Sequence, residues 1–330
     1  MKKKILVTGA GGFIGHHLVR ELTRRGHNII AVDPAFYDSD MNHARTKFIK
    51  HKNVTLVRLK IEEVDDKSKY LDGINAIIHL AAIAGVQQSI DSPARSFFQN
   101  TMSMTTALLM AGTRKVPLIY ASSSSVNGAG DAKLGRFEPL SPYGASKIAC
   151  EALAHSFSEC YGIKTIGIRP FTVYGPRGRN DMVIYKIANA LRLGHPAVMI
   201  YSNGTTERCF TYVDDVVERF IKVAENPTRA HGGIYDCCGR DSYTIKSVIS
   251  MTSHIIGQAA IVHGCLTITG LDAAGDIQKS QGNNAPFEKD YGPSKETTLE
   301  SGLRKFIAWH KEFHKKPKSK VVRQSKLKAR

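Results

Sequence analysis

A glycine-rich turn near the start of the chain constrains the fold more than any other feature. Gly9, Gly12 and Gly15 follow the apolar run KILVT and precede a stretch with helical periodicity. In a strand–turn–helix unit, the first glycine permits a tight turn, the second lets backbone N–H groups approach a pyrophosphate, and the third lets helix and strand pack closely. The positive end of the helix dipole then faces the phosphates. The motif predicts a dinucleotide site, with an ordinary glycine turn as the alternative.

An acidic residue after the next expected strand favours the dinucleotide site. The run NIIAV is followed by Asp33, eighteen residues beyond Gly15. A carboxylate at this place accepts hydrogen bonds from the ribose hydroxyls of NAD and repels the 2′-phosphate of NADP. The sequence therefore predicts NAD as the cofactor.

The order of the expected elements indicates the fold class. Short β-branched runs alternate with helical stretches from KILVTG to AIIHLAA, and this alternation is typical of βαβ units and a parallel sheet. Further strands are expected at Pro117–Ala121 and Lys164–Arg169, and helices at Ala94–Ala111 and Tyr143–Cys160. We expect an α/β fold with a Rossmann-type, doubly wound parallel sheet over residues 1–170, the NAD-binding domain.

The second half has a looser pattern. Residues 171–314 are expected to form mainly a smaller α/β substrate-binding cap, with some elements returning to the first domain. Gly270–Lys295 is rich in Gly, Asn, Pro and Asp and reads as mostly loop, and Leu299–Phe313 is expected as a last helix.

Residues 315–330 form a basic tail that carries eight of the positive charges behind the net charge of +17. A disordered, solvated tail is the simpler interpretation, and contact with an anionic surface is the alternative. No specific nucleic-acid or membrane partner is predicted.

Composition excludes several classes of protein. With 42% hydrophobic and 23% charged residues, the chain lacks the signature of disorder. Its longest apolar stretch, Ala76–Val86, is shorter than the ~20 residues that a membrane-spanning helix needs. The six cysteines have no metal-binding spacing and no export signal precedes them, so we expect reduced thiols, a cytoplasmic protein and no metal.

Two further motifs suggest catalysis. Tyr143 and Lys147 stand four residues apart in SPYGASK, so they share one face of the expected helix, and the serine run Ser122–Ser125 follows an expected strand. Oxidising an alcohol needs a base for the hydroxyl proton. A tyrosinate stabilised by an ammonium group can be that base, and a serine hydroxyl can hold the substrate oxygen. Tyrosine and lysine at this spacing often form only an exposed pair, but together with the glycine turn they predict an alcohol-oxidising site.

With these motifs in this order, the chain resembles the extended short-chain dehydrogenase/reductase family up to about Trp309. The shared motifs are TGAGGFIG, HLAA, SSSSV, SPYGASK, RPFTVYGP and FTYVDDVV. The resemblance implies that Ser123, Tyr143 and Lys147 are catalytic, with Ser122 and Ser124 as substitutes for Ser123. It implies cofactor contacts from Gly9, Gly12, Phe13, Ile14, Gly15, Asp33, Lys60, Ile61, Leu80, Ala81, Ala82, Tyr143 and Lys147.

The segment FTVYGPRGRNDM is most similar to that of the UDP-glucuronate 4-epimerases, a nucleotide-sugar branch of the family. In such enzymes hydride leaves C4 of the sugar for NAD and returns to the opposite face. The resemblance places Thr172 and Arg179 near the sugar carboxylate with Ser124 and Ser125, and Arg208 near the diphosphate. A guanidinium suits either anion because its fork of donors engages two oxygens at once. A solvated loop arginine is the alternative for Arg179.

The expected function is therefore an NAD-dependent UDP-sugar 4-epimerase, with UDP-glucuronate preferred. Sugar dehydratases of the family carry an acidic residue just after the catalytic hydroxyl, where this chain has Ser124 and Ser125, so elimination is not expected. The alternatives are a UDP-glucose/UDP-galactose 4-epimerase, an epimerase or reductase for another nucleotide sugar, and a non-catalytic nucleotide-sugar sensor. The resemblance also implies a homodimer formed through the helices at Ala94–Ala111 and Tyr143–Cys160.

Several positions depart from the family pattern. Lys60 and Ile61 replace an Asp-Ile pair at the adenine, and Gln87 and Gln88 replace an Arg-Tyr pair beside the pocket. The remaining departures are Asn127 for tyrosine, Cys209 for aspartate, and Asp236-Cys237-Cys238 for Asn-Ile-Gly. The thiols are expected to be buried fillers rather than nucleophiles, because no histidine stands at a recognisable pairing distance in the sequence.

Overall fold

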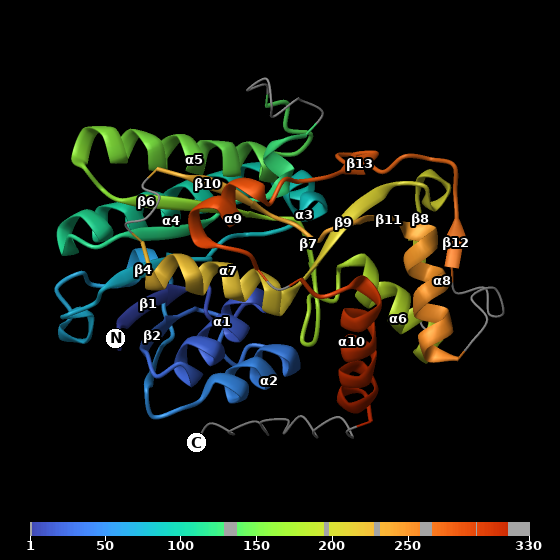
Figure 1. Ribbon diagram of the computed structural model, residues 1–330, viewed down its shortest axis with the longest axis horizontal. Helices are drawn as coiled ribbons and strands as arrows, with labels where there is room; N and C mark the ends of the chain where they lie inside the picture. Colours follow the sequence, from blue (N-terminus) through green and yellow to red (C-terminus); the bar gives the residue numbers. More distant parts are fainter. Residues whose placement is uncertain are drawn as a thin grey trace, which may run out of the picture.

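A seven-stranded parallel sheet forms the centre of the molecule (Figure 1). The computed structural model describes residues 2–128, 137–194, 198–227, 232–257, 266–294 and 296–315. The strand order is β10-β6-β5-β4-β1-β2-β3, so the order reverses between β1 and β4. The strands are β1 (Lys4–Thr8), β2 (Asn28–Val32), β3 (Val54–Val57), β4 (Ala76–His79), β5 (Leu118–Ala121), β6 (Thr165–Pro170) and β10 (Ile234–Cys237). The doubly wound α/β fold expected from the sequence is confirmed.

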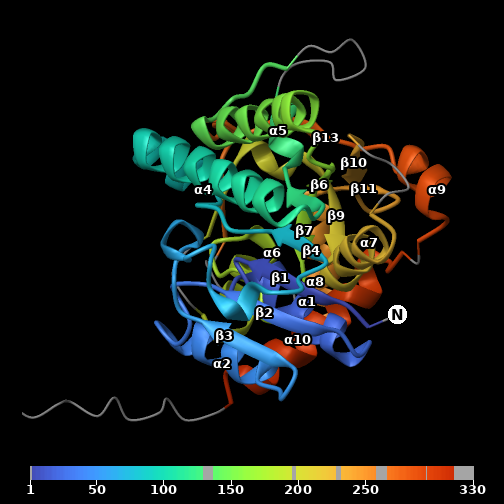
Figure 2. The same cartoon turned by 90° about the vertical axis from the view of Figure 1, so that its left-hand side faces the viewer.

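Helices cover both faces of this sheet, which explains why its central strands are apolar along their whole length. One face carries α4 (Pro93–Arg114) and α5 (Pro142–Tyr161), which lie side by side, with the short α3 (Val86–Asp91) next to them (Figure 2). The other face carries α1 (Phe13–Arg24) and α7 (Val213–Glu225), with α2 (Asp40–Ile49) against α1. In α1 the buried residues Gly15, Leu18, Val19 and Leu22 recur at helical spacing and make the apolar stripe.

The remaining elements form a smaller α/β cap beside the sheet (Figure 1). Its central strand β9 (Glu207–Tyr212) pairs with β7 (Thr172–Tyr174), β11 (Ser242–Thr244) and β13 (Lys279–Ser280). A separate pair joins β8 (Val198–Ile200) and β12 (Leu266–Ile268). The cap helices are α6 (Val183–Leu193), α8 (Ile245–Ile256) and α10 (Leu299–Phe313). Helix α9 (Ala285–Tyr291) instead packs against β10 of the sheet. The described residues also form the single-turn 3-10 helices η1 (Ile61–Glu63), η2 (Lys69–Leu71), η3 (Ser124–Val126) and η5 (Ser202–Gly204).

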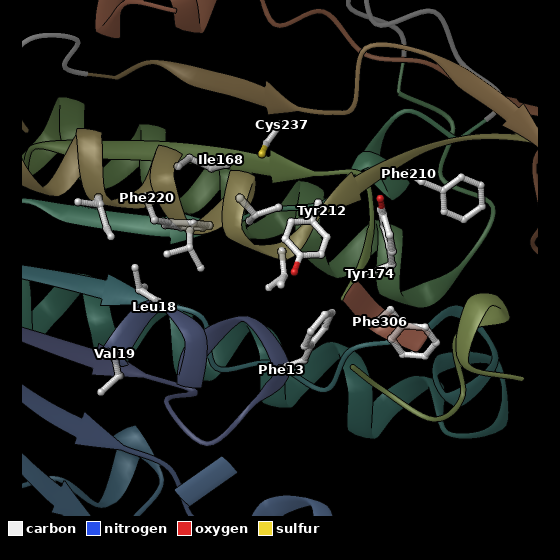
Figure 3. Packing of buried hydrophobic residues seen from close by; sticks show 14 of the residues in the cluster. Phe13, Leu18, Val19, Ile168, Tyr174, Phe210, Tyr212, Phe220, Cys237 and Phe306 are labelled. Atoms are coloured by element: carbon white, nitrogen blue, oxygen red, sulfur yellow. The ribbon is translucent and has the colours of Figure 1, made fainter. Parts of the chain in front are cut away.

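One hydrophobic core runs from the sheet into the cap (Figure 3). Phe13 and Leu18 of α1 belong to the same cluster as Phe220 of α7, Tyr212 of β9 and Phe306 of α10. Because this core is continuous, the cap is anchored on the helix that follows the glycine turn.

The expected helices lie close to their predicted bounds: Ala94–Ala111 is α4, Tyr143–Cys160 is α5, and Leu299–Phe313 is α10. The sheet does not end near residue 170, because β10 from the second half adds its seventh strand. The segment Gly270–Lys295 is mostly irregular, as expected, but it contains β13 and α9. Residues 316–330 of the basic tail lie outside the described residues. Among the helices described, none has the length and apolar character needed to cross a membrane.

Candidate active site

A large cavity opens at the carboxyl ends of the parallel strands, beside the point where the strand order reverses. In doubly wound sheets, ligands bind at this place. Its volume of about 1700 Å³ exceeds that of a typical site for one small ligand, so it has room for a dinucleotide and a second molecule. Every candidate site residue from the sequence lines it: Gly9, Gly12, Phe13, Ile14, Gly15, Asp33, Lys60, Ile61, Leu80, Ala81, Ala82, Ser123, Ser124, Ser125, Tyr143, Lys147, Thr172, Arg179 and Arg208.

The glycine turn forms a cradle that side chains would fill. Gly9 has a φ of +67°, and a Cβ atom there would lie 2.7 Å from the backbone nitrogen of Ala81. A Cβ atom on Gly15 would lie 2.0 Å from the carbonyl oxygen of Gly9. Both positions therefore require glycine for close backbone approach, and the backbone stays open to a pyrophosphate as the motif predicts.

Asp33 is held at the end of β2 by backbone hydrogen bonds. Its carboxylate accepts the N–H groups of Gly11 at 3.0 Å and Ala35 at 2.8 Å. Burial raises the pKa of Asp33, and these two hydrogen bonds oppose that rise. The carboxylate thus lies fixed beside the glycine turn, in a position that fits the ribose of a dinucleotide.

Tyr143 and Lys147 face the cavity from the first turns of α5. The helix begins at Pro142, and the Ser141 side chain caps it by accepting the Gly144 N–H at 3.1 Å. The Lys147 ammonium lies 5.8 Å from the centre of the Tyr143 ring and donates to the Ala121 carbonyl, at the end of β5, at 2.8 Å. Lys147 is only 4% exposed, so its charge is held in place beside the phenol.

The serine run connects β5 to this pair. Ser123 caps the 3-10 helix η3: its hydroxyl oxygen accepts the Ser125 N–H at 3.1 Å and lies 3.2 Å from the Ser125 hydroxyl. The Ser122 hydroxyl is instead engaged by Glu151 at 2.5 Å. Of these serines, Ser123 therefore combines a cavity position with an N-terminal place on a rigid turn.

Asn100 on α4 is a buried support that the sequence analysis did not identify. Its side chain accepts the Ile83 N–H at 2.8 Å and donates to the Ser146 hydroxyl at 3.0 Å. The Ser146 hydroxyl in turn donates to the carbonyl of Tyr143 at 2.8 Å. Asn100 thereby joins α4, the segment after β4 and the first turns of α5, which carry Tyr143.

Two arginines enter the cavity from the cap side, and each is paired with a carboxylate that also lines the cavity. Arg179 donates from Nε and Nη2 to Asp181, at 2.9 and 2.5 Å. Burial alone would raise the pKa of Asp181, but the hydrogen bond and charge of Arg179 outweigh it and lower that pKa. Arg208 on β9 pairs with Asp276. No sequence motif indicated either acidic partner, although Asp181 stands only two residues after Arg179.

The described residues contain no group of three or more His, Cys, Asp or Glu side chains that could hold a metal ion. The Cys209 and Cys238 side chains pack with Phe171 in a small buried cluster. Five cysteines lie in the described part of the chain, and all are free thiols.

The chain is similar to known proteins over most of its length. Residues 5–238 match the model of the NAD dependent epimerase/dehydratase family. Protein CapI of Staphylococcus aureus is 34% identical over 335 residues, which cover 95% of this chain and 100% of CapI.

Solved structures share the whole fold. UDP-glucuronic acid 4-epimerase from Bacillus cereus, in complex with UDP-glucuronic acid and NAD, has a TM-score of 0.85 and 28% identity, covering 94% of this chain and 99% of that chain. UDP-N-acetylglucosamine 4-epimerase from Methanobrevibacter ruminantium M1, in complex with UDP-N-acetylmuramic acid, has a TM-score of 0.83 and 27% identity, with the same coverage of 94% and 99%.

Proposed function

The chain belongs to the NAD dependent epimerase/dehydratase family, and we propose that it is a nucleotide-sugar 4-epimerase whose substrate is UDP-glucuronate. One observation carries the proposal. A single cavity brings together the Tyr143–Lys147 pair, the glycine cradle and the guanidinium groups of Arg179 and Arg208. An alcohol-oxidising site that faces two fixed cations suits a substrate with an alcohol, a diphosphate and a further anionic group.

The residues of the cradle would hold NAD. Gly9, Gly12 and Gly15 leave the backbone open to the pyrophosphate, and Asp33 would accept from the ribose. The chemistry that bound NAD would supply there is reversible acceptance of a hydride, here from C4 of the sugar.

The chain's own groups move the proton and hold the sugar. Tyr143 removes the C4 hydroxyl proton and gives it back in the return step. The adjacent Lys147 ammonium stabilises the tyrosinate, and the Ser123 hydroxyl binds the C4 oxygen. Because the pair lies at the start of α5, the positive end of the helix dipole adds to this stabilisation.

Residues on the cap side of the cavity would determine the substrate specificity. Arg179 would bind the sugar carboxylate together with Thr172, Ser124 and Ser125, which line the same cavity, and Arg208 would bind the diphosphate. The Bacillus cereus neighbour binds UDP-glucuronic acid in a similar fold, which supports this assignment.

Proton NMR of the purified protein tests the proposal. UDP-glucuronate, UDP-glucose and UDP-N-acetylglucosamine are incubated separately, with and without added NAD. Conversion of UDP-glucuronate to UDP-galacturonate is expected, and it should be lost in Tyr143→Phe, which keeps the ring and removes the acid–base group. Turnover of neutral UDP-sugars alone would refute the glucuronate assignment. No turnover of any of the three would refute 4-epimerase activity on these UDP-sugars.

A neutral UDP-sugar is the second candidate. The Arg179 guanidinium is already paired with Asp181, so it is not an uncompensated cation in the cavity. The Methanobrevibacter neighbour, a UDP-N-acetylglucosamine 4-epimerase, also has a closely similar fold. The NMR experiment separates the two candidates directly.

The protein is also proposed to be a cytoplasmic homodimer. Helices α4 and α5 lie side by side (Figure 2). Large apolar side chains remain exposed on them: Phe98 at 65%, Met102 at 57%, Leu109 at 58% and Tyr161 at 69%. Several large apolar side chains exposed on two adjacent helices are typical of an interface, and free thiols are typical of a reducing compartment. Light scattering should give a dimer for the wild type and a monomer for Met102→Glu combined with Leu109→Glu. A monomeric wild type would contradict the dimer.

A further inference from the structure

Arg45 lies between the cofactor side and the sugar side of the cavity. It belongs to α2, is 7% exposed and lines the cavity wall. Its Nε and Nη2 atoms donate to the Arg177 carbonyl at 3.1 and 2.8 Å, and Nη2 also reaches the Gly178 carbonyl at 3.2 Å. A side chain from the dinucleotide half is therefore bound to the backbone of the loop that carries Arg179.

That loop, residues 175–181, depends on outside contacts for its shape. Arg177 adopts a φ of +58°, in the left-handed region that a non-glycine residue rarely occupies. Such a conformation persists only where the surrounding structure holds it. Within the loop, the Gly178 N–H donates to the Gly175 carbonyl at 3.1 Å, and Met182 after the loop donates to Arg179 at a longer 3.4 Å.

A second side chain from the same half holds the loop one residue earlier. The Nε2 atom of His17, on α1, lies 2.9 Å from the Pro176 carbonyl. Burial lowers the pKa of His17 to about 4, so at neutral pH the ring is uncharged and donates through Nε2 to this carbonyl. Three successive carbonyls, of residues 176 to 178, are thus bound by side chains from α1 and α2.

The charge of Arg45 is placed between two residues with predicted binding roles. Burial lowers the pKa of Arg45 to about 10, while Asp33 favours its charged form and Arg179 opposes it. The guanidinium remains protonated at neutral pH. It therefore interacts with both the carboxylate expected to contact the cofactor ribose and the cation expected to contact the sugar.

We propose that Arg45 is a positioning residue that clamps loop 175–181 to the dinucleotide half and thereby sets the place from which Arg179 reads the sugar. This inference rests on the proposed function, because it gives Arg179 a role in substrate selection. Arg45 itself is not assigned a contact with the C4 hydroxyl of the sugar or with the nicotinamide ring. Its removal should affect recognition of the sugar carboxylate more than that of the nucleotide.

Hydrogen–deuterium exchange tests the clamp without any sugar. In NAD-loaded Arg45→Met, amides of residues 175–182 should exchange roughly ten-fold faster than in the wild type, because the lost donors free the loop. Arg45→Lys, which keeps a cation, should fall between them. Arg58→Met is the matched control: Arg58 is 63% exposed, pairs with Asp38 and does not line the cavity. Unchanged exchange in Arg45→Met would overturn the clamp.

Calorimetric binding to the NAD-loaded protein tests the link to Arg179. Arg45→Met should weaken UDP-glucuronate roughly ten-fold and UDP-glucose less than about two-fold, and it should add no further loss in an Arg179→Met background. Equal weakening of both sugars, or additive losses in the double variant, would overturn the positioning role. A wild type that shows no preference for UDP-glucuronate would count against the proposed substrate. The exchange experiment uses no sugar, so it still tests whether Arg45 holds the loop.

Discussion

The carboxylate of Glu151 receives both arms of the Arg169 guanidinium, with Nε–Oε1 and Nη2–Oε2 distances of 2.7 Å. The same carboxylate accepts the Ser122 hydroxyl, and it stands one helical turn beyond Lys147 on α5. The pair is largely buried, with side-chain exposures of 14% for Arg169 and 9% for Glu151. It therefore fastens β6 and the end of β5 to α5, the helix that carries Tyr143 and Lys147.

Glu151→Gln should destabilise the protein by about 3–5 kcal/mol, because it leaves a buried guanidinium without its counter-charge. Urea unfolding measures this loss. Glu300→Gln is the control, since Glu300 forms an (i, i+4) pair with Arg304 and both side chains are 57% exposed. A loss below about 1 kcal/mol is expected there. Equal losses in the two variants would show that burial gives the Glu151 pair no special weight.

Ser123→Ala should lower kcat by about 10²- to 10⁴-fold with little change in KM, because the hydroxyl is assigned to the transition from alcohol to carbonyl. Ser124→Ala should change kcat far less, since Ser124 is assigned to the sugar rather than to the reacting oxygen. Steady-state rates from the NMR assay give both constants. If Ser124→Ala lost as much kcat as Ser123→Ala, the assignment within the serine run would be wrong.

Asp33→Asn should weaken NAD binding by roughly 10- to 100-fold, because a hydrogen bond to a charged group is worth about 1.5–3 kcal/mol. It should also reduce the preference for NAD over NADP, since the repulsive charge is gone. Burial raises the pKa of Asp33, so protonation of the wild type should weaken NAD binding as the pH falls, and this fall should be absent from Asp33→Asn. Fluorescence titration with NAD and NADP at several pH values measures these affinities. An Asp33→Asn variant with the wild-type affinity for NAD would contradict the role of Asp33.

Many of the residues that line the cavity could be singled out from the sequence because their signals are local. The glycine turn needs three positions within seven residues, and Tyr143 and Lys147 need only helical spacing. The parallel sheet followed from the alternation of elements. By contrast, β10 could not be placed in the sheet, since its partner β6 lies far away in the sequence.

The parts of the site that the sequence did not reveal are tertiary contacts. Arg208 donates a hydrogen bond to Asp276, which is 68 residues away in the sequence, and Arg45 donates to the Arg177 carbonyl, 132 residues away. No period or motif connects such positions. β13 was missed for the same reason, since its two residues form a strand only by pairing with β9.

Acid should destabilise the fold through buried neutral histidines. Burial, as the largest cause, lowers the pKa of His79 and of His310 to about 3, from an ordinary value of 6.5. Because these folded-state values are depressed, the unfolded chain binds more protons below pH ~6.5, and stability falls as the pH is lowered toward the folded values. Each histidine should cost about 1.4 kcal/mol per pH unit in that window.

The measurement is urea unfolding between pH 7 and pH 4 for the wild type and His79→Asn. His79 lies 2.8 Å from the Thr8 hydroxyl through Nδ1, a contact that an asparagine side chain can imitate without titrating in this range. The variant should therefore show a shallower loss of stability with falling pH, by about 1.4 kcal/mol per pH unit. The same slope in both proteins would mean that His79 is protonated in the folded protein, and that burial does not keep it neutral.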